Sequence, residues 1–131
     1  MIRIFVVDDN AMIRTHLRAL LEGRPGWAVV GEAVNGRHAV ETFHKHMPHI
    51  TVMDLVMPEM DGLEAARRLI KRYPAVIILI VTTDPLRQLV DVAKTVGVKG
   101  LCPKGKPDCL LKAIEILSAG GTHFHQERPA A

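Results

Sequence analysis

The sequence is poor in aromatic residues and has no clusters of like charge. Phe, Trp and Tyr make up 4% of its 131 residues, and no run of five like charges occurs although the net charge is +3. Nucleic-acid binding by this chain alone is therefore disfavoured, because it needs a dense basic stripe with aromatic residues. No apolar run approaches the roughly 20 residues of a membrane span, and Arg3 interrupts any signal peptide. The expected compartment is the cytoplasm, with no membrane contact.

Only two cysteines are present, Cys102 and Cys109. Their spacing matches no zinc motif, and one pair of thiols does not build the disulfide framework of a small secreted domain. We interpret both as small apolar residues in a reducing compartment. His123, His125 and the three histidines within residues 44–49 are interpreted as side chains that bind no metal.

Short continuous apolar runs alternate along the chain with longer segments of helical periodicity. The runs are typical of strands buried on both faces of a sheet, and they cover residues 2–7, 28–34, 50–54, 76–82 and 100–102. Helices are expected over residues 11–22, 37–46, 62–73, 86–96 and 107–119, the fourth with Pro85 at its first position. Five strand–helix units predict an α/β fold, a doubly wound five-stranded parallel sheet with helices on both faces. Residues 1–119 are expected to form one domain, and the polar residues 120–131 a linker or disordered tail.

Ionisable and hydroxyl side chains stand at the carboxyl ends of four of these five runs. Asp8 and Asp9 end the first, Asp54 ends the third, Thr82 ends the fourth, and Lys104 follows the fifth. Ligands of open α/β sheets bind at this edge, so these side chains are expected to converge. One such aspartate alone is more often a helix cap, but a set drawn from four strand ends favours a site.

Three carboxylates that lie close together repel one another, which raises their pKa values. A bound divalent cation removes that cost, and Mg²⁺ suits the site because it takes few carboxylates and keeps water or phosphate oxygens. A carboxylate in such a place is also a nucleophile toward phosphorus, giving an aspartyl phosphate. Thr82 and Lys104 then supply donors to the phosphoryl oxygens.

The pattern closely resembles the receiver domain of bacterial two-component response regulators, the CheY-like family. The resemblance covers residues 2–119 and rests on "VDDN", "MDLVMPEMDGLEAARRL", "IVTT" and the "KG" before the last helix. It implies the flavodoxin-like strand order 2-1-3-4-5. It also implies a signalling phosphoacceptor that assists its own phosphorylation and dephosphorylation, and not an enzyme with a separate substrate.

Family roles are carried over position by position. Asp54 resembles the phosphoacceptor, Asp9 the direct Mg²⁺ ligand and Asp8 its water-mediated partner. The backbone carbonyl of Val56 resembles the third protein ligand. Thr82 resembles the hydroxyl that moves to the phosphoryl group, and Lys104 resembles the lysine that pairs with it.

Three residues depart from the family pattern. Leu101 stands where many members have an aromatic residue that swings inward, Thr83 stands where a smaller residue is common, and Pro103 precedes the lysine instead of following it. Pro103 is also expected to shorten the pairing of the fifth strand, because it lacks an N–H.

The resemblance implies a sensor histidine kinase as phosphoryl donor and a homodimer through the face of the fourth helix, fifth strand and fifth helix. The stretch "ILSAGGTHF" resembles the exit from receivers of LuxR/NarL-type transcription regulators. The output is therefore expected to be transcription, with DNA bound only through a helix-turn-helix domain outside this chain; a stand-alone receiver is the alternative.

Two other functions stay open. A flavodoxin-like cofactor binder has the same fold, although the acidic "DDNAM" loop lacks the residues of a phosphate cradle. A degenerate receiver that acts only through protein contacts is kept open by Leu101 and Thr83.

Overall fold

The computed structural model describes residues 1–125 as an alternation of strands and helices. In chain order the elements are β1 (Ile2–Val7), α1 (Ala11–Glu22), β2 (Trp27–Ala33), α2 (Gly36–His46), β3 (Ile50–Asp54), α3 (Gly62–Arg72), β4 (Ile78–Thr82), α4 (Arg87–Val96), β5 (Gly100–Pro103), α5 (Pro107–Ser118) and β6 (His123–Phe124). All strand pairs are parallel, and the sheet order is β2-β1-β3-β4-β5-β6. The predicted five-strand order 2-1-3-4-5 is confirmed.

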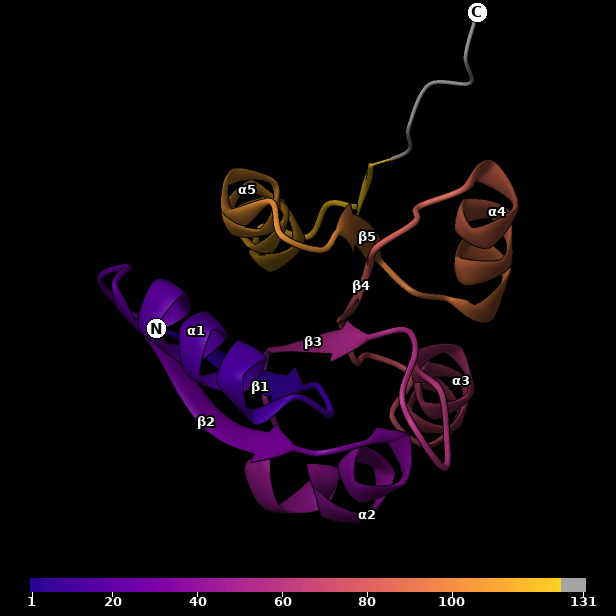
Figure 1. The fold of residues 1–131 in the computed structure, drawn as a ribbon, viewed down its shortest axis with the longest axis horizontal. Coiled ribbons are helices and arrows are strands. Elements are labelled where there is room, and N and C mark those ends of the chain that lie inside the picture. Colours follow the sequence, from indigo (N-terminus) through magenta and orange to yellow (C-terminus); the bar gives the residue numbers. More distant parts are fainter. Residues whose placement is uncertain (126–131) are drawn as a thin grey trace, which may run out of the picture.

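The helices cover both faces of the sheet (Figure 1). Helices α1 and α5 lie on one face, and α2, α3 and α4 lie on the other. Each face has its own apolar core, because side chains of each strand point alternately to the two sides. Phe5, for example, packs among the residues of α2 and α3, whereas Val6 packs toward α1 and α5. Within residues 1–125, no helix is long and apolar enough to cross a membrane.

Local hydrogen bonds set the points where elements begin. The side chains of Asn10, Asn35 and Asp61 accept the N–H three residues on and start α1, α2 and α3. Strand β4 begins at Ile78, later than predicted, because the N–H of Val76 is used in a turn by Tyr73 O at 2.9 Å.

The predicted start of the fourth helix was wrong. Pro85 lies before α4, and Leu86 is the N-cap without a side-chain hydrogen bond to the helix. The N–H of Leu86 donates to Asp84 O, which forms a turn ahead of the first helical residue.

The chain after α5 adds a strand that the sequence pattern did not predict. Strand β6 pairs with β5, where His123 N donates to Lys99 O and His125 N donates to Leu101 O. These residues belong to the segment expected to be a linker or disordered tail. The rest of that segment, residues 126–131, lies outside the described part of the chain.

Candidate functional site

The carboxyl end of β1 places two carboxylates in different environments. Asp8 is 2% exposed, whereas Asp9 is exposed. The N–H of Asp8 donates to Ala33 O, and its Oδ1 accepts from the N–H of Asn10 at 2.9 Å. Asp8 is thus fixed between the last residue of β2 and the N-cap residue of α1.

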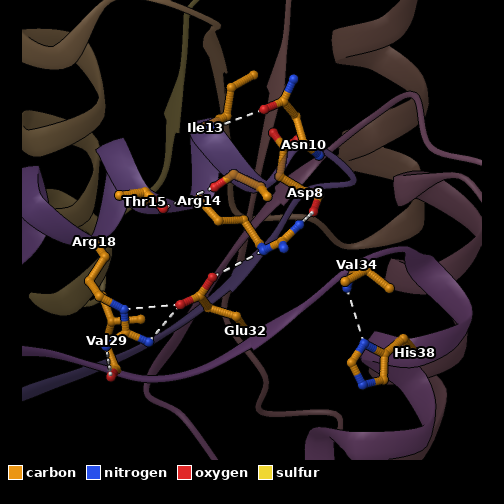
Figure 2. Close-up of polar contacts among 11 residues, drawn as sticks. Asp8, Asn10, Ile13, Arg14, Thr15, Arg18, Val29, Glu32, Val34 and His38 are labelled. Carbon is orange, nitrogen blue, oxygen red and sulfur yellow. Dashed lines mark hydrogen bonds and ion pairs between the residues drawn. The ribbon is translucent and has the colours of Figure 1, made fainter.

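Arg14 of α1 also binds the end of β1, and the sequence pattern did not predict this contact. Figure 2 shows Arg14 between Asp8 and Glu32. Its Nη1 donates to Asp8 O at 2.7 Å, and its Nε donates to Glu32 Oε1 at 3.0 Å. Arg18 binds the other oxygen, Oε2, of the same glutamate at 2.7 Å. The clue in the sequence was Glu32, an acidic residue in the middle of an otherwise apolar run.

Asp54 ends β3 and is held by a close backbone approach. Asp54 is 7% exposed and lies on the strand next to β1. The N–H of Gly62 donates to Leu55 O at 2.7 Å. A Cβ on Gly62 would lie 2.3 Å from the carbonyl oxygen of Asp54. Only a glycine therefore lets α3 begin against the backbone that carries Asp54.

Lys104 brings its ammonium to two of the carboxylates. Its Nζ lies 3.0 Å from Asp54 Oδ2 and 3.1 Å from Asp8 Oδ2, and its side chain is 22% exposed. The N–H of Lys104 donates to Thr82 O at 2.7 Å. The two residues predicted to contact a phosphoryl group are thus joined through their backbones.

Thr82 is buried at the end of β4, one position beyond the residue that pairs with Asp54. Its hydroxyl oxygen accepts from the N–H of Asp84 at 3.3 Å, a long hydrogen bond that leaves the hydroxyl proton free for another acceptor. Thr83, by contrast, is exposed and lines the cleft at this edge together with Asp8, Asp54 and Lys104.

Burial and neighbouring charges shift the pKa values of Asp54 and Lys104. Burial raises the pKa of Asp54, and the negative charges of Asp8 and Asp9 add to this, although the hydrogen bond from Lys104 acts the other way. Burial acts to lower the pKa of Lys104, but its bonds to Asp54 and Asp8 prevail and raise it. One ammonium thus balances three carboxylates only in part.

The remaining predicted features are placed as follows. Val56 lies in the loop after β3 with its side chain 73% exposed. Its backbone carbonyl as a metal ligand stays a prediction. Leu101 is fully buried on the face of α3 and α4, and Phe124 packs against the same cluster. Pro103 does not shorten β5 as expected: it pairs with Thr82, and the hydrogen bond to Thr82 O comes from the N–H of the next residue, Lys104, so this pairing needs no N–H from position 103.

The donor set suits a hard cation. One carboxylate oxygen from each of Asp8, Asp9 and Asp54 lies within 4.8 Å of the others. Oxygen ligands on one side with room for waters on the other are what Mg²⁺ requires. The three carboxylates therefore fit the Mg²⁺ that the resemblance implies.

Comparison with known proteins gives one family. The model of the response regulator receiver domain matches residues 4–115. The transcriptional regulatory protein DegU of Brevibacillus brevis is 33% identical over 125 residues, which are 95% of this chain and 53% of that protein. A protein-glutamate methylesterase/protein-glutamine glutaminase of Alkalilimnicola ehrlichii is 41% identical over 105 residues, 79% of this chain and 27% of that protein. The chain thus spans about half or less of these two relatives.

A solved structure agrees with these sequence matches. A LuxR-family two-component response regulator from Aurantimonas sp. SI85-9A1 superposes with a TM-score of 0.90 at 36% identity, covering 94% of this chain and 89% of that one. The likeness extends over nearly the whole chain.

Proposed function

Because the chain belongs to the response regulator receiver family, we propose that it accepts a phosphoryl group from a sensor histidine kinase on Asp54, in a Mg²⁺-dependent reaction. The observation that carries the proposal is the meeting of Asp8, Asp9, Asp54 and Lys104 at one sheet edge. Receiver domains are signalling domains, so the modification would act by changing the shape of this chain. We assign the receiver to residues 1–119 and the reaction to the cytoplasm.

In the proposed reaction a carboxylate oxygen of Asp54 attacks the phosphorus of a phosphohistidine. The new O–P bond forms as the P–N bond breaks, and the imidazole leaves with that electron pair. Lys104 contacts Oδ2, and among residues 1–125 no hydrogen-bond donor contacts Oδ1. We therefore propose Oδ1 as the attacking atom.

The metal ligands in this proposal are Asp9, Asp54 and the carbonyl of Val56 directly, with Asp8 acting through water. The exposure of Asp9 supports its direct role. Asp8 is assigned a water-mediated role, because Asn10 and Lys104 already contact its two carboxylate oxygens. When bound, Mg²⁺ neutralises the carboxylates and polarises the phosphoryl oxygens.

After transfer, Lys104 and Thr82 would move to the phosphoryl oxygens. Lys104 would exchange a carboxylate oxygen for a phosphoryl oxygen, and Thr82 would rotate away from the N–H of Asp84. Charge-assisted hydrogen bonds contribute about 1.5–3 kcal/mol each before reorganisation costs. Two such contacts are enough to bias an equilibrium between conformations a few kcal/mol apart.

The test is phosphorylation by acetyl phosphate, followed by intact-mass spectrometry. We expect one phosphoryl adduct on the wild-type protein with Mg²⁺, none with EDTA and none on Asp54→Asn. Asp84→Asn is the matched control, because Asp84 is exposed on the same loop edge and should leave the adduct unchanged. An adduct of equal yield on Asp54→Asn would refute the assignment.

We further propose that the output is transcription, through a DNA-binding domain outside this chain. Its support is the likeness to DegU and to the LuxR-family regulator. Exposed Leu86 and Val92, at the start of α4 and within it, support a homodimer through the face of α4, β5 and α5. Light scattering with and without beryllofluoride tests this: Val92→Glu should abolish any dimer that forms, and a monomer under both conditions would refute it.

A further inference from the structure

A second cluster of ligating side chains comes from β5, α5 and β6. Figure 1 shows α5 beside β5, and β6 pairs with β5. Cys102 comes from β5, Cys109 from α5 and His123 from β6. One ligand atom of each lies within 4.8 Å of the other two. The two sulfur atoms are 3.2 Å apart, and Cys109 Sγ is 3.7 Å from His123 Nε2.

The fold builds this cluster from three separate elements. Cys102 belongs to the core between the sheet and α5, where it is 0% exposed, and Cys109 packs against the same core from the first turn of α5. His123 is fixed beside them because β6 pairs Gly100 with His123. A side chain at position 100 would crowd this pairing, since a Cβ would lie 3.0 Å from the carbonyl oxygen of His123 and 2.8 Å from a terminal methyl carbon of Leu79.

The three side chains have few other partners. Cys109 Sγ–H donates to Cys102 Sγ, and Cys102 Sγ–H donates to the carbonyl oxygen of Cys109 at 3.6 Å. Thiol hydrogen bonds are weak, so little is lost when they are replaced. Burial, together with the positive charges of Lys112 and His125, lowers the pKa of His123. Its imidazole is therefore held in the neutral form that coordinates metals.

We propose that Cys102, Cys109 and His123 form a binding site for a thiophilic metal ion such as Zn²⁺. Zn–S bonds of about 2.3 Å and Zn–N bonds of about 2.0 Å place tetrahedral ligands roughly 3.5–3.8 Å apart. The sulfur–nitrogen distance of 3.7 Å already fits, and the sulfur pair at 3.2 Å needs to open by only about half an ångström. Water or His125, two residues beyond His123, completes the coordination.

The geometry favours metal over a disulfide. A disulfide needs the sulfur atoms to close from 3.2 Å to about 2.05 Å, a larger movement than metal binding requires. It also gives the imidazole of His123 no role. Metal binding releases one proton from each thiol to solvent, and the cation offsets the burial that raises the pKa of the Cys102 thiol.

A metal here would fasten the chain after α5 to the edge of the sheet. Strand β6 is held by backbone hydrogen bonds to β5, among them those donated by the N–H groups of His123 and His125. A bond from His123 to a metal shared with β5 and α5 would add a side-chain attachment to this backbone pairing. The site is separate from the acidic edge and uses none of the residues proposed for phosphoryl transfer.

The experiment uses untagged, fully reduced protein under anaerobic conditions, with excess Mg²⁺ to occupy the acidic edge. Zn²⁺ affinity is measured by competition with a chromophoric chelator, and Co²⁺ is the spectroscopic probe, because thiolate ligation gives a charge-transfer band. We expect one equivalent of metal and a thiolate band in the wild type. Amide hydrogen exchange at His123 and His125 should slow when Zn²⁺ is added.

The variants separate this site from adventitious binding. Cys109→Ser should abolish the thiolate band or weaken it sharply, and His123→Ala should weaken Zn²⁺ binding at least about tenfold. His44→Ala, which removes an exposed histidine elsewhere, should behave as wild type. Circular dichroism checks that each variant is folded. Absence of a thiolate band in the reduced wild type, or unchanged Zn²⁺ affinity in folded Cys109→Ser, would overturn the proposal.

Discussion

Replacement of Lys104 by methionine tests the charge balance of the acidic edge. Methionine keeps most of the apolar stem and removes the ammonium, which lies 3.0 Å from Asp54 and 3.1 Å from Asp8. Without Mg²⁺, the variant leaves two buried carboxylates close to a third, Asp9, and removes the ammonium that contacts them. We expect a large loss of stability in EDTA and a much smaller one in Mg²⁺.

The magnitude follows from burial. Removing one partner of a buried ion pair costs about 3–5 kcal/mol, and we expect about 3 kcal/mol because Lys104 is 22% exposed and water can reach the site. In saturating Mg²⁺ the cation takes over the neutralising role, so the loss should fall to about 1 kcal/mol, the upper end for an exposed pair. Mg²⁺ should bind the variant at least as tightly as the wild type.

The assay is urea unfolding at neutral pH, in EDTA and in excess Mg²⁺, with Lys106→Met as the matched control. Lys106 is exposed two residues away and should change stability little under either condition. The deficit of Lys104→Met should also vanish at low pH, because protonated carboxyl groups need no counter-charge. An equal deficit with and without Mg²⁺ would show that Lys104 acts through packing and not through charge.

Three further variants test the supports of the site. Gly62→Ala places a Cβ 2.3 Å from the Asp54 carbonyl oxygen and should lower the free energy of unfolding in urea by about 2–3 kcal/mol. Gly23→Ala is the control and should be tolerated, because its Cβ would meet no atom closer than 3.4 Å; similar losses for the two variants would contradict the close approach at Gly62. Glu32→Gln removes the charge between two arginines of α1 and should lower the free energy of unfolding by about 1 kcal/mol. Glu41→Gln, at an exposed ion pair, should change it hardly at all, and equal effects would mean that the ion pairs of Glu32 contribute little. Asp54→Asn should stabilise the metal-free protein at neutral pH, because burial raises the pKa of Asp54 above its usual 3.8. The wild-type protein then loses stability as pH rises through that raised pKa, so the free energies of unfolding of wild type and Asp54→Asn should converge in acid. A stabilisation by Asp54→Asn that persists unchanged in acid would contradict the raised pKa of Asp54.

The acidic edge was predictable because it follows from topology. Four of the five apolar runs lead into ionisable or hydroxyl residues, and a parallel sheet brings the carboxyl ends of its strands to one edge. The sequence therefore indicated that Asp8 and Asp54 would be neighbours although 45 residues lie between them. The brace from Arg14 was not predictable, because an arginine on a helix face is usually solvated and its partner, Glu32, lies on another element.

The cluster of Cys102, Cys109 and His123 was not predictable for a different reason. Zinc motifs are recognised by short spacings within one loop, and six residues separate these two cysteines. They meet because the turn at Lys104–Lys106 folds α5 back over β5. His123 joins them only because β5 has a free edge, whose carbonyl groups pair with β6. A strand of two residues is too short to leave a periodic pattern.

The charges at the acidic edge explain why a conformational change would follow the proposed modification. At neutral pH three carboxylates and one ammonium leave a net charge of −2 in a partly buried site. In the proposed reaction, a bound Mg²⁺ would bring this charge to zero before Asp54 attacks phosphorus. Converting the Asp54 carboxylate to an aspartyl phosphate with a charge of about −2 then adds close to one negative charge. Only Lys104 and neutral hydrogen-bond donors remain to stabilise this added charge. Lys104 and Thr82 are joined by a backbone hydrogen bond of 2.7 Å, so movement of either side chain toward the phosphoryl group acts on the paired ends of β4 and β5 together.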